Sequence, residues 1–245
     1  MRVQRKGYMR KSTRNIFAAA EPRGDVTAVR EFVQGAADAN ADAVFLLGGL
    51  KRAGDRPRVF GEILKALASC RLPSFYIPGP DDAPITEYLR EAADMEVVFP
   101  FIRGVHSTFA FAPGYVLVSG FGGRVEDRPD AVREEGARLS YPGWELEYRL
   151  KFVRELRDYA KIFLFSQSPA HKGLSQEGSE TVAEMIKTHN PRLVLVSGEQ
   201  QRTEMLARSL VVSLGTLSKG QFSTVNFVSF GVEHRQLRKR EDIAA

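Results

Sequence analysis

The sequence contains a single cysteine, Cys70, among its 245 residues, so no internal disulfide bond can form. A chain without disulfides fits a reducing compartment, and we expect a cytoplasmic protein. No stretch approaches eighteen consecutive apolar residues, so we expect no membrane span. The first residues form no apolar segment of the kind found in secretory signals, and we expect none.

Histidine is also scarce, with four residues in the whole chain. His106, His189 and His234 show no spacing typical of metal ligands. His171 follows Ser-Pro-Ala, where it fits either the rim of a site or a surface loop.

The net charge of +5 is concentrated in one short segment. Six basic residues precede the first acidic residue, and without these six charges the remainder of the chain carries −1. We therefore predict a basic arm at 1–14, one domain at 15–232 and a charged tail at 233–245. The arm fits a solvated tail, and it also fits contact with nucleic acid.

Hydrophobic residues make up 43% of the chain and charged residues 27%, which is ordinary for a globular α/β protein. Buried strands and amphipathic helices alternate in the first half, as expected for a parallel sheet covered by helices. The strands are expected at 15–20, 43–47, 74–77, 161–165 and 192–196, with helices after Asp25, around 60–67, from Pro84 and at 179–189.

The rest of the chain has a more mixed pattern. Short strands are expected at 97–99, 107–111 and 115–119, the last two forming a hairpin around Ala-Pro-Gly. We expect a surface insertion at 126–141, a helix at 144–158 in which Trp144 packs inward, and a terminal hairpin of 209–214 with 221–230. Together these elements predict two mixed sheets with outer helices in one domain.

Three strands end in glycine turns that carry polar groups. The stretches are V-F-L-L-G-G-L at 44–50, F-Y-I-P-G-P-D-D-A-P at 75–84 and L-V-L-V-S-G-E-Q-Q at 193–201. Sites in open α/β sheets form at the carboxyl ends of strands, so these turns predict one shared site. Asp81 and Asp82 also fit a simpler role as turn and N-cap residues of the helix that follows.

The order of these loops resembles the calcineurin-like metallophosphoesterase superfamily over roughly 15–230. The similar stretches are G-G-L-K-R at 48–52, G-P-D-D at 79–82, S-Q-S-P at 166–169, G-E-Q-Q at 198–201 and L-G-T-L at 214–217. The P-G-P-x-D-A-P form is similar to a divergent bacterial branch with altered metal ligands. The resemblance implies a four-layer α/β (α+β) sandwich, with two mixed β-sheets face to face and helices outside.

The family's metal-binding positions carry other residue types here. The resemblance places the first metal-binding Asp and His at Glu21 and Arg23, and the bridging Asp at Gly49. It places the Asn and the proton-donating His at Pro80 and Asp81. The later histidines correspond to Ser166, Glu199 and Gln201. Asp82 alone keeps its family type, in a position that supports the loop.

These replacements decide what the resemblance implies about cofactors. Hydrolysis in the family uses two metals about 3.5–4 Å apart that ionise a water. Gly49 supplies no bridge, and the guanidinium of Arg23 repels a cation, so we expect no dinuclear Mn, Fe or Zn centre. The carboxylates of Glu21, Asp81 and Glu199 leave open one Mg²⁺ or Ca²⁺ ion.

Three functions remain open from the sequence. The first is a catalytically weak or inactive member of the fold that binds a phosphate-bearing small molecule or a partner protein. Its binding residues would be Glu21, Arg23, Asp81, Asp82, Ser166, His171, Glu199 and Gln201, with Asp81 and Ser166 at the family's catalytic positions. The second is a working phosphoesterase with a carboxylate-rich single-cation site. The third is a nucleic-acid-associated protein that uses the arm, which the near-neutral body disfavours.

Overall fold

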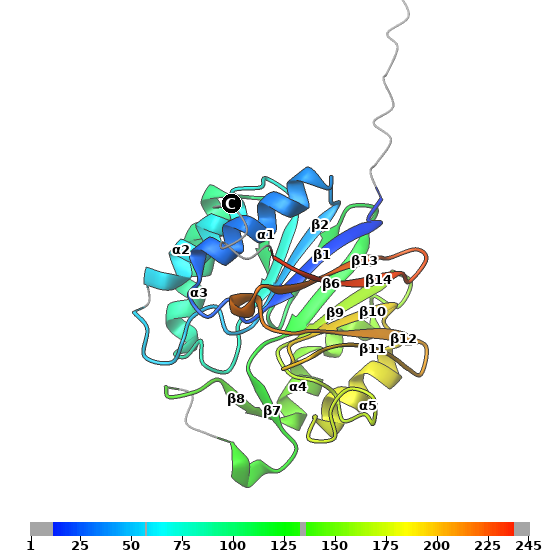
Figure 1. Ribbon diagram of the computed structural model, residues 1–245. Coiled ribbons are helices and arrows are strands. Elements are labelled where there is room, and N and C mark those ends of the chain that lie inside the picture. Colours follow the sequence, from blue (N-terminus) through cyan, green and yellow to red (C-terminus); the bar gives the residue numbers. More distant parts are fainter. Residues whose placement is uncertain (1–11, 57, 133–135, 238–245) are drawn as a thin grey trace, which may run out of the picture.

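The computed structural model describes residues 12–56, 58–132 and 136–237. Two six-stranded sheets pack against each other, and a short ladder of β7 (Arg124–Glu126) with β8 (Ser140–Pro142) lies beside them (Figure 1). The first sheet contains, in spatial order, β14 (Val232–Gln236), β13 (Gln221–Asn226), β1 (Asn15–Ala20), β2 (Ala43–Leu47), β3 (Ser74–Ile77) and β4 (Ile102–Gly104). The second contains β11 (Gln201–Leu206), β12 (Ser209–Leu214), β10 (Leu193–Val196), β9 (Lys161–Phe165), β6 (Val116–Phe121) and β5 (Phe109–Ala112).

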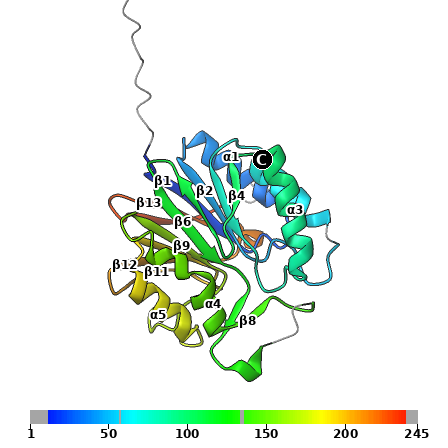
Figure 2. The ribbon, with the colours of Figure 1, turned by 180° about the vertical axis from the view of Figure 1, so that it is seen from behind.

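Helices cover the outer face of each sheet, and Figure 2 shows the two helical layers on opposite sides. The first layer holds α1 (Val26–Asp38), α2 (Arg58–Ala68) and α3 (Ile85–Val98), and the second holds α4 (Gly143–Arg149) and α5 (Glu180–His189). Short 3-10 helices lie at Pro129–Ala131, Lys151–Arg154 and Leu217–Lys219. The predicted four-layer sandwich is therefore confirmed.

The alternation of side chains along each strand builds three apolar layers. In β1, Phe17 and Ala19 pack under the helices, whereas Ile16 and Ala18 pack between the sheets. This alternation is the two-residue period of a strand that is buried on both faces. A third core, which includes Phe163, lies beneath α4 and α5.

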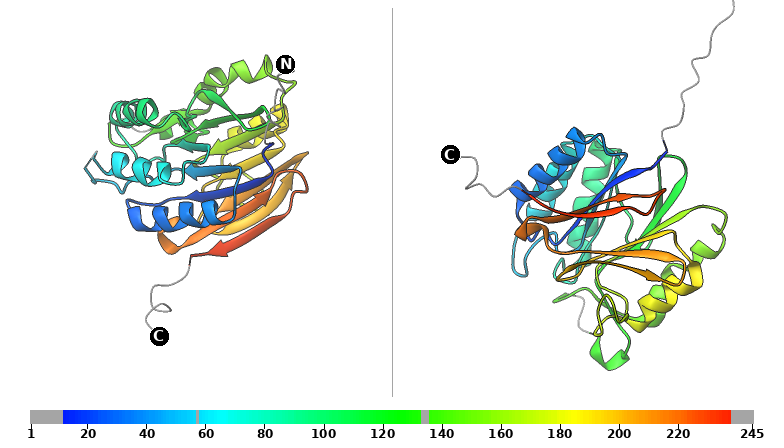
Figure 3. Two further views of the ribbon diagram at one scale, coloured as in Figure 1. Left: turned by 90° about the horizontal axis from the view of Figure 1, so that it is seen from above. Right: turned by 45° about the vertical axis from the view of Figure 1, so that its right-hand side comes forward.

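The two ends of the described chain meet in the first sheet. In Figure 3 the blue strand β1 runs beside the red strands near the C-terminus, and β1 pairs antiparallel with β13. Because β14 continues to Gln236, the sheet extends past residue 232, where we placed the end of the domain, into the predicted tail at 233–245. Most of the basic arm lies outside the described residues, but Thr13 is buried and donates to Pro113 O at 2.7 Å.

The predicted terminal hairpin is wrong. Strand β12 pairs with β11 and β10 in the second sheet, whereas β13 pairs with β1 and β14 in the first. The 3-10 turn at Leu217–Lys219 ends at Gly220, whose φ of +82° favours glycine. The turn sends the chain across to the other sheet and does not reverse it within one.

The segment after β3 also differs from prediction. Val97 and Val98 end helix α3, so the expected strand at 97–99 is β4, five residues later. The insertion expected at 126–141 contributes β8 and the buried side chains of Leu139 and Tyr141. These apolar residues anchor the described part of the insertion in the third core.

The helix expected at 144–158 is shorter, and its tryptophan faces outward. Helix α4 ends at Arg149 and a 3-10 turn follows, which keeps Leu146, Leu150 and Val153 on one buried face. Trp144 is 65% exposed because it lies two positions from Leu146, on the opposite side of the helix. The expectation that Trp144 packs inward is therefore wrong.

No helix in the described ranges has the length and apolar character needed to cross a membrane.

Candidate functional site

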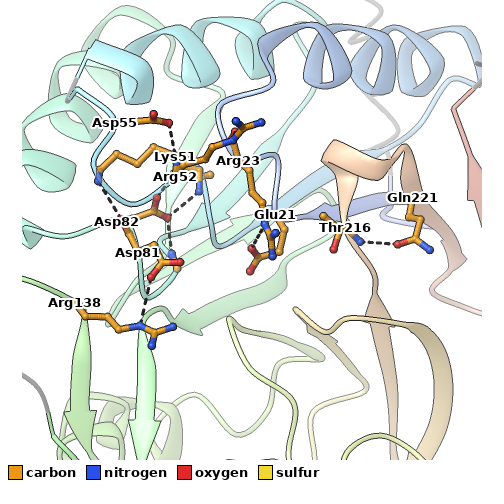
Figure 4. Close-up of polar contacts among 12 residues, drawn as sticks. Glu21, Arg23, Lys51, Arg52, Asp55, Asp81, Asp82, Arg138, Thr216 and Gln221 are labelled. Atoms are coloured by element: carbon orange, nitrogen blue, oxygen red, sulfur yellow. Dashed lines mark hydrogen bonds and ion pairs between the residues drawn. The ribbon is translucent and has the colours of Figure 1, made fainter. Parts of the chain in front are cut away.

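The carboxyl ends of the parallel strands meet at one edge of the sandwich. Strands β1, β2 and β3 run parallel in the first sheet, and β6, β9, β10 and β12 run parallel in the second. Their loops bring together residues far apart in sequence, and Figure 4 shows several of the polar side chains involved. The three glycine turns from which a shared site was predicted meet at this edge.

Glycines allow the central loops to touch through their backbones. Gly48 and Gly49 have φ of +51° and +52°, the left-handed region that favours glycine. A Cβ atom on Gly79 would overlap the backbone nitrogen of Gly49. A Cβ atom on Gly49 would overlap the carboxylate of Glu21. Glu21 therefore fills the space that a side chain at position 49 would take.

Glu21 and Arg23 form an ion pair over this glycine loop. The Nε atom of Arg23 lies 3.2 Å from Oε2 of Glu21, and their side chains are 50% and 18% exposed. Both residues have positive φ, 48° for Arg23 and 56° for Glu21. This strained conformation is held because Arg23 N donates to Gly49 O at 2.8 Å and Gly24 N donates to Leu50 O at 2.9 Å.

Burial raises the pKa of Glu21 above its ordinary value, while the guanidinium of Arg23 lowers it. The charges of Asp81 and Arg138 also act on Glu21, which places the four groups in one electrostatic environment. Two carboxylates and two guanidiniums therefore share the mouth of the site.

Asp82 holds the loops together from beneath. Its buried carboxylate accepts hydrogen bonds from Gly79 N at 2.6 Å and from Leu50 N and Lys51 N at 2.9 Å each. Complete burial raises the pKa of Asp82 to about 7, although these three hydrogen bonds act to lower it. The alternative role of Asp82 as an N-cap is wrong, because the N-cap of α3 is Pro84 and has no side-chain hydrogen bond.

Asp81 points the other way, toward solvent. Its Oδ1 lies 3.4 Å from Nε of Arg138, with both side chains nearly half exposed at 48% and 45%. The buried Lys51 donates through Nζ to the backbone oxygen of Asp81 at 3.0 Å. The turn at 81 is therefore fixed by a lysine, while its carboxylate remains near the surface.

Two serines form the floor of the site. Ser166 Oγ donates to Gly123 O at 2.5 Å, so its hydrogen is already engaged. Ser197 Oγ is buried and has no hydrogen-bond partner in the described structure. Both lie against Gly48, where an added Cβ would meet Ser166 Cβ at 3.1 Å and Ser197 Oγ at 3.2 Å.

Three expected site residues are not in contact with this cluster. Glu199 is exposed, and no described contact joins it to the Glu21–Arg23 pair. The side chain of Gln201 turns toward the first sheet and donates to Phe222 O at 2.6 Å. His171 Nδ1 accepts from Gly173 N within its own loop at 3.3 Å, which agrees with the surface-loop alternative.

Arg138 and Ser197 were missed by sequence reasoning. Arg138 lies in a charged stretch that predicts an exposed insertion, and no pattern distinguishes it from the other charges there. Ser197 directly follows a buried strand and precedes Gly198, and this strand-end position was the available signal.

The side chains present do not fit a dinuclear metal centre. The space at Gly49 holds a carboxylate already paired with Arg23, and Ser166 donates its hydrogen to a carbonyl. Asp81 is paired with Arg138, and Gln201 points elsewhere. Across the described ranges, no group of three or more His, Cys, Asp or Glu side chains is placed to hold a metal ion.

The chain is similar to known proteins both in sequence, through a family model, and in structure. Residues 54–237 match the family model described as metallophosphoesterase, calcineurin superfamily. The crystal structure of TT1561 from Thermus thermophilus is 47% identical, with a TM-score of 0.88, and the match covers 93% of this chain and 100% of that one. No curated protein matches the chain.

More distant structures share the fold alone. A dimetal phosphatase from Danio rerio has a TM-score of 0.67 at 9% identity, with 94% of this chain and 98% of that chain covered. An archaeal phosphodiesterase has a TM-score of 0.54 at 10% identity, with 91% and 99% covered.

Proposed function

The chain belongs to the calcineurin superfamily of metallophosphoesterases, and we propose that it binds a phosphate-bearing small molecule at a site where an ion pair takes the place of the dinuclear metal centre. Phosphoester hydrolysis is then weak or lost. The observation that carries this proposal is the Glu21–Arg23 pair seated over Gly49.

The two arginines at the mouth suit a phosphate. In the described structure Arg23 and Arg138 are each held through Nε, by Glu21 and Asp81 respectively. This leaves two terminal nitrogens on each guanidinium for a ligand. A guanidinium held in this way is preorganised for bidentate contact with phosphate oxygens. The carboxylates orient the arginines and keep the unliganded site close to neutral.

The proposal favours a small molecule over the other partners. Arg23 and Arg138 are each about half exposed and both act electrostatically on Glu21, which favours one compact anion as the ligand of both. The basic arm proposed for nucleic acid lies almost entirely outside the described residues. The single-cation phosphoesterase remains a second candidate, because the Glu21 carboxylate lies over Gly49, to which the resemblance assigns the family's bridging Asp.

Isothermal titration calorimetry in EDTA tests the proposal, with inorganic phosphate and phenyl phosphate as probes. We expect binding without metal, weakened about tenfold or more in Arg23→Ala and in Arg138→Ala, since charge-assisted hydrogen bonds contribute roughly 1.5–3 kcal/mol. Arg58→Ala is the matched control, because Arg58 is an 87% exposed arginine paired with Glu62 on α2.

Two results would contradict the proposal. Equal affinity for the phosphate probes in wild type and both site variants would show that Arg23 and Arg138 do not bind the phosphate. Binding or turnover of phenyl phosphate that requires added Mg²⁺ would instead support the single-cation phosphoesterase.

A further inference from the structure

The backbone that carries Arg138 is bonded to its neighbours on both sides. Arg138 directly precedes the buried Leu139, whose N donates to Pro80 O at 2.8 Å and whose carbonyl accepts from Arg124 N, also at 2.8 Å. Arg124 begins β7, which pairs in parallel with β8. Arg138 therefore starts a returning limb, residues 138–142, that is fixed between the loop after β3 and strand β7.

An outgoing limb, residues 123–127, contains β7 and is fixed by side chains from the end of β9. Val125 exchanges two hydrogen bonds with the amide of Gln167, because Val125 N donates to Oε1 at 2.7 Å and Nε2 donates to Val125 O at 3.2 Å. The preceding residue, Ser166, donates to Gly123 O. The side chain of Gln167 thus pairs with this limb as a backbone peptide group would.

The outgoing limb ends at the N-terminus of helix α5, where Asp127 supplies a negative charge. Its Oδ1 accepts hydrogen bonds from Ser179 Oγ at 2.9 Å, Thr181 Oγ1 at 2.8 Å and Thr181 N at 3.0 Å, and its Oδ2 accepts from Glu180 N at 2.9 Å. The first N–H groups of a helix favour an anion. Partial burial acts to raise the pKa of Asp127, but these hydrogen bonds outweigh it and lower the pKa below its ordinary value.

The threonine that binds Asp127 also touches the element that follows the returning limb. Gly143 is the first residue of α4 and comes directly after β8. A Cβ atom on Gly143 would overlap Oγ1 of Thr181. The residues just before Asp127 and Gly143 are paired with each other in the β7–β8 ladder. A displacement of Asp127 would therefore pass through the ladder to the backbone of Arg138.

We infer that Asp127 is a positioning residue for Arg138: its contacts with α5 fix both limbs and set where the Arg138 guanidinium meets a ligand. The ion pair with Asp81 does not do this alone, because it joins two nearly half-exposed side chains 3.4 Å apart, and such pairs contribute little. Sites bind well when supporting residues fix the groups that contact the ligand. The identity of that ligand, phosphate, rests on the proposed function.

Isothermal titration calorimetry of inorganic phosphate in EDTA tests whether Asp127 acts through Arg138. We expect Asp127→Ala to weaken binding about threefold or more, both in the wild type and in an Arg23→Ala background. In an Arg138→Ala background the same change should alter the affinity by less than about twofold, because the side chain that Asp127 positions is gone. Asp127→Asn keeps one acceptor oxygen and should weaken binding less than Asp127→Ala does.

Glu184→Ala is the matched control, since Glu184 is an exposed acidic residue of the same helix, paired with Lys187. It should leave the phosphate affinity within about twofold of wild type. An equal loss from Asp127→Ala in the wild-type and Arg138→Ala backgrounds would overturn the inference. So would unchanged affinity in Asp127→Ala beside a clear loss in Arg138→Ala, a result that would leave the proposed function standing.

Hydrogen exchange tests the positioning without a ligand, so it decides on Asp127 even if the wild type binds no phosphate and the proposed function fails. In Asp127→Ala the amide of Leu139, which is bonded to Pro80 O, should exchange at least about threefold faster. In Glu184→Ala it should exchange at the wild-type rate. An unchanged rate in Asp127→Ala would overturn the inference. Should Asp127→Ala fail to fold, Asp127→Asn provides the same comparison.

Discussion

Among the single side chains, Arg23 is the one on which this account depends most. Its guanidinium holds a carboxylate that is mostly shielded from water, and both residues have left-handed backbone conformations. Such conformations cost about 1–3 kcal/mol each and persist where surrounding contacts enforce them. Hydrogen bonds from this loop to Gly49 and Leu50 provide that enforcement. The ion pair is therefore built into the loop.

A double-mutant cycle measures what the pair contributes. Because Arg23 is half exposed, we expect Arg23→Ala to lower the free energy of unfolding by about 1 kcal/mol at pH 7, between the values for exposed and buried pairs. In a Glu21→Gln background the same change should cost less than half as much, because no unpaired carboxylate remains. Urea unfolding of the four proteins provides the measurement.

The effect of Arg23→Ala should also depend on pH. Burial raises the pKa of Glu21, so the carboxyl is neutral in the folded state at low pH and the loss of Arg23 should then cost little. The cost should grow as pH rises and Glu21 ionises. Arg58→Ala is the control for a surface pair and should stay within about 0.5 kcal/mol of wild type. If Arg23→Ala lowered the free energy of unfolding equally in the wild-type and Glu21→Gln backgrounds, Arg23 and Glu21 would not be energetically coupled.

The individual site residues were only partly predictable from sequence. Glu21, Arg23 and Asp81 follow buried strands, and strand order alone brought them to one edge. Gln201 was expected beside them for the same reason, but the first residue of β11 points its amide across to Phe222. The direction of a side chain at a strand end depends on the turn before it, and the local sequence pattern does not identify the type of that turn.

At the level of helices and strands, the buried central strands were the most predictable elements. Strands β1, β2, β3 and β9 begin and end at the residues expected. Each is a compact apolar run bounded by polar or turn residues. The edge strands β11 and β14 were not predicted, because their exposed faces carry charged residues and their pattern resembles a loop. The prediction that β12 pairs with β13 was wrong because the sheet that a strand joins depends on contacts distant in sequence.

The loop between β4 and β5 contains a second buried titratable group. His106 Nδ1 accepts from Gly122 N at 2.9 Å, which ties this loop to the segment that follows β6. Its Nε2 is buried without a partner in the described structure. Burial, together with the nearby charge of Arg149, lowers the pKa of His106 to about 3. The imidazole is therefore neutral in the folded protein.

This histidine predicts acid sensitivity. The folded-state pKa lies below the ordinary value of 6.5, so on acidification the unfolded chain binds a proton first. The contribution of neutral His106 to the free energy of unfolding is complete above about pH 6.5 and is lost progressively as pH falls toward 3. At pH 4 the loss should reach about 3 kcal/mol. His106→Asn keeps an acceptor for Gly122 N and does not titrate, so urea unfolding should show a shallower fall in stability between pH 7 and pH 4. An identical fall in both proteins would contradict the assignment.

For the chain as a whole, the family is shown, and the loss of its metal centre is our proposal. The four-layer fold and the match over 54–237 place the chain among the calcineurin-superfamily metallophosphoesterases. At the positions where the resemblance places metal ligands, the described structure has the Glu21–Arg23 ion pair, Gly49 and a Ser166 that donates to a carbonyl. A fold retains its loop framework when its ligands change, because the framework depends on strand packing and glycine contacts.

The metal content of the purified chain tests the central claim most directly. Elemental analysis of protein prepared without added metal or chelator gives the number of Mn, Fe and Zn ions per chain. Because Glu21 and Arg23 occupy the space over Gly49 as a pair, we expect fewer than one tightly bound transition-metal ion per chain. About two ions per chain, lost together with hydrolysis of phenyl phosphate on chelation, would show that a dinuclear centre assembles despite the ion pair, and the account would be wrong.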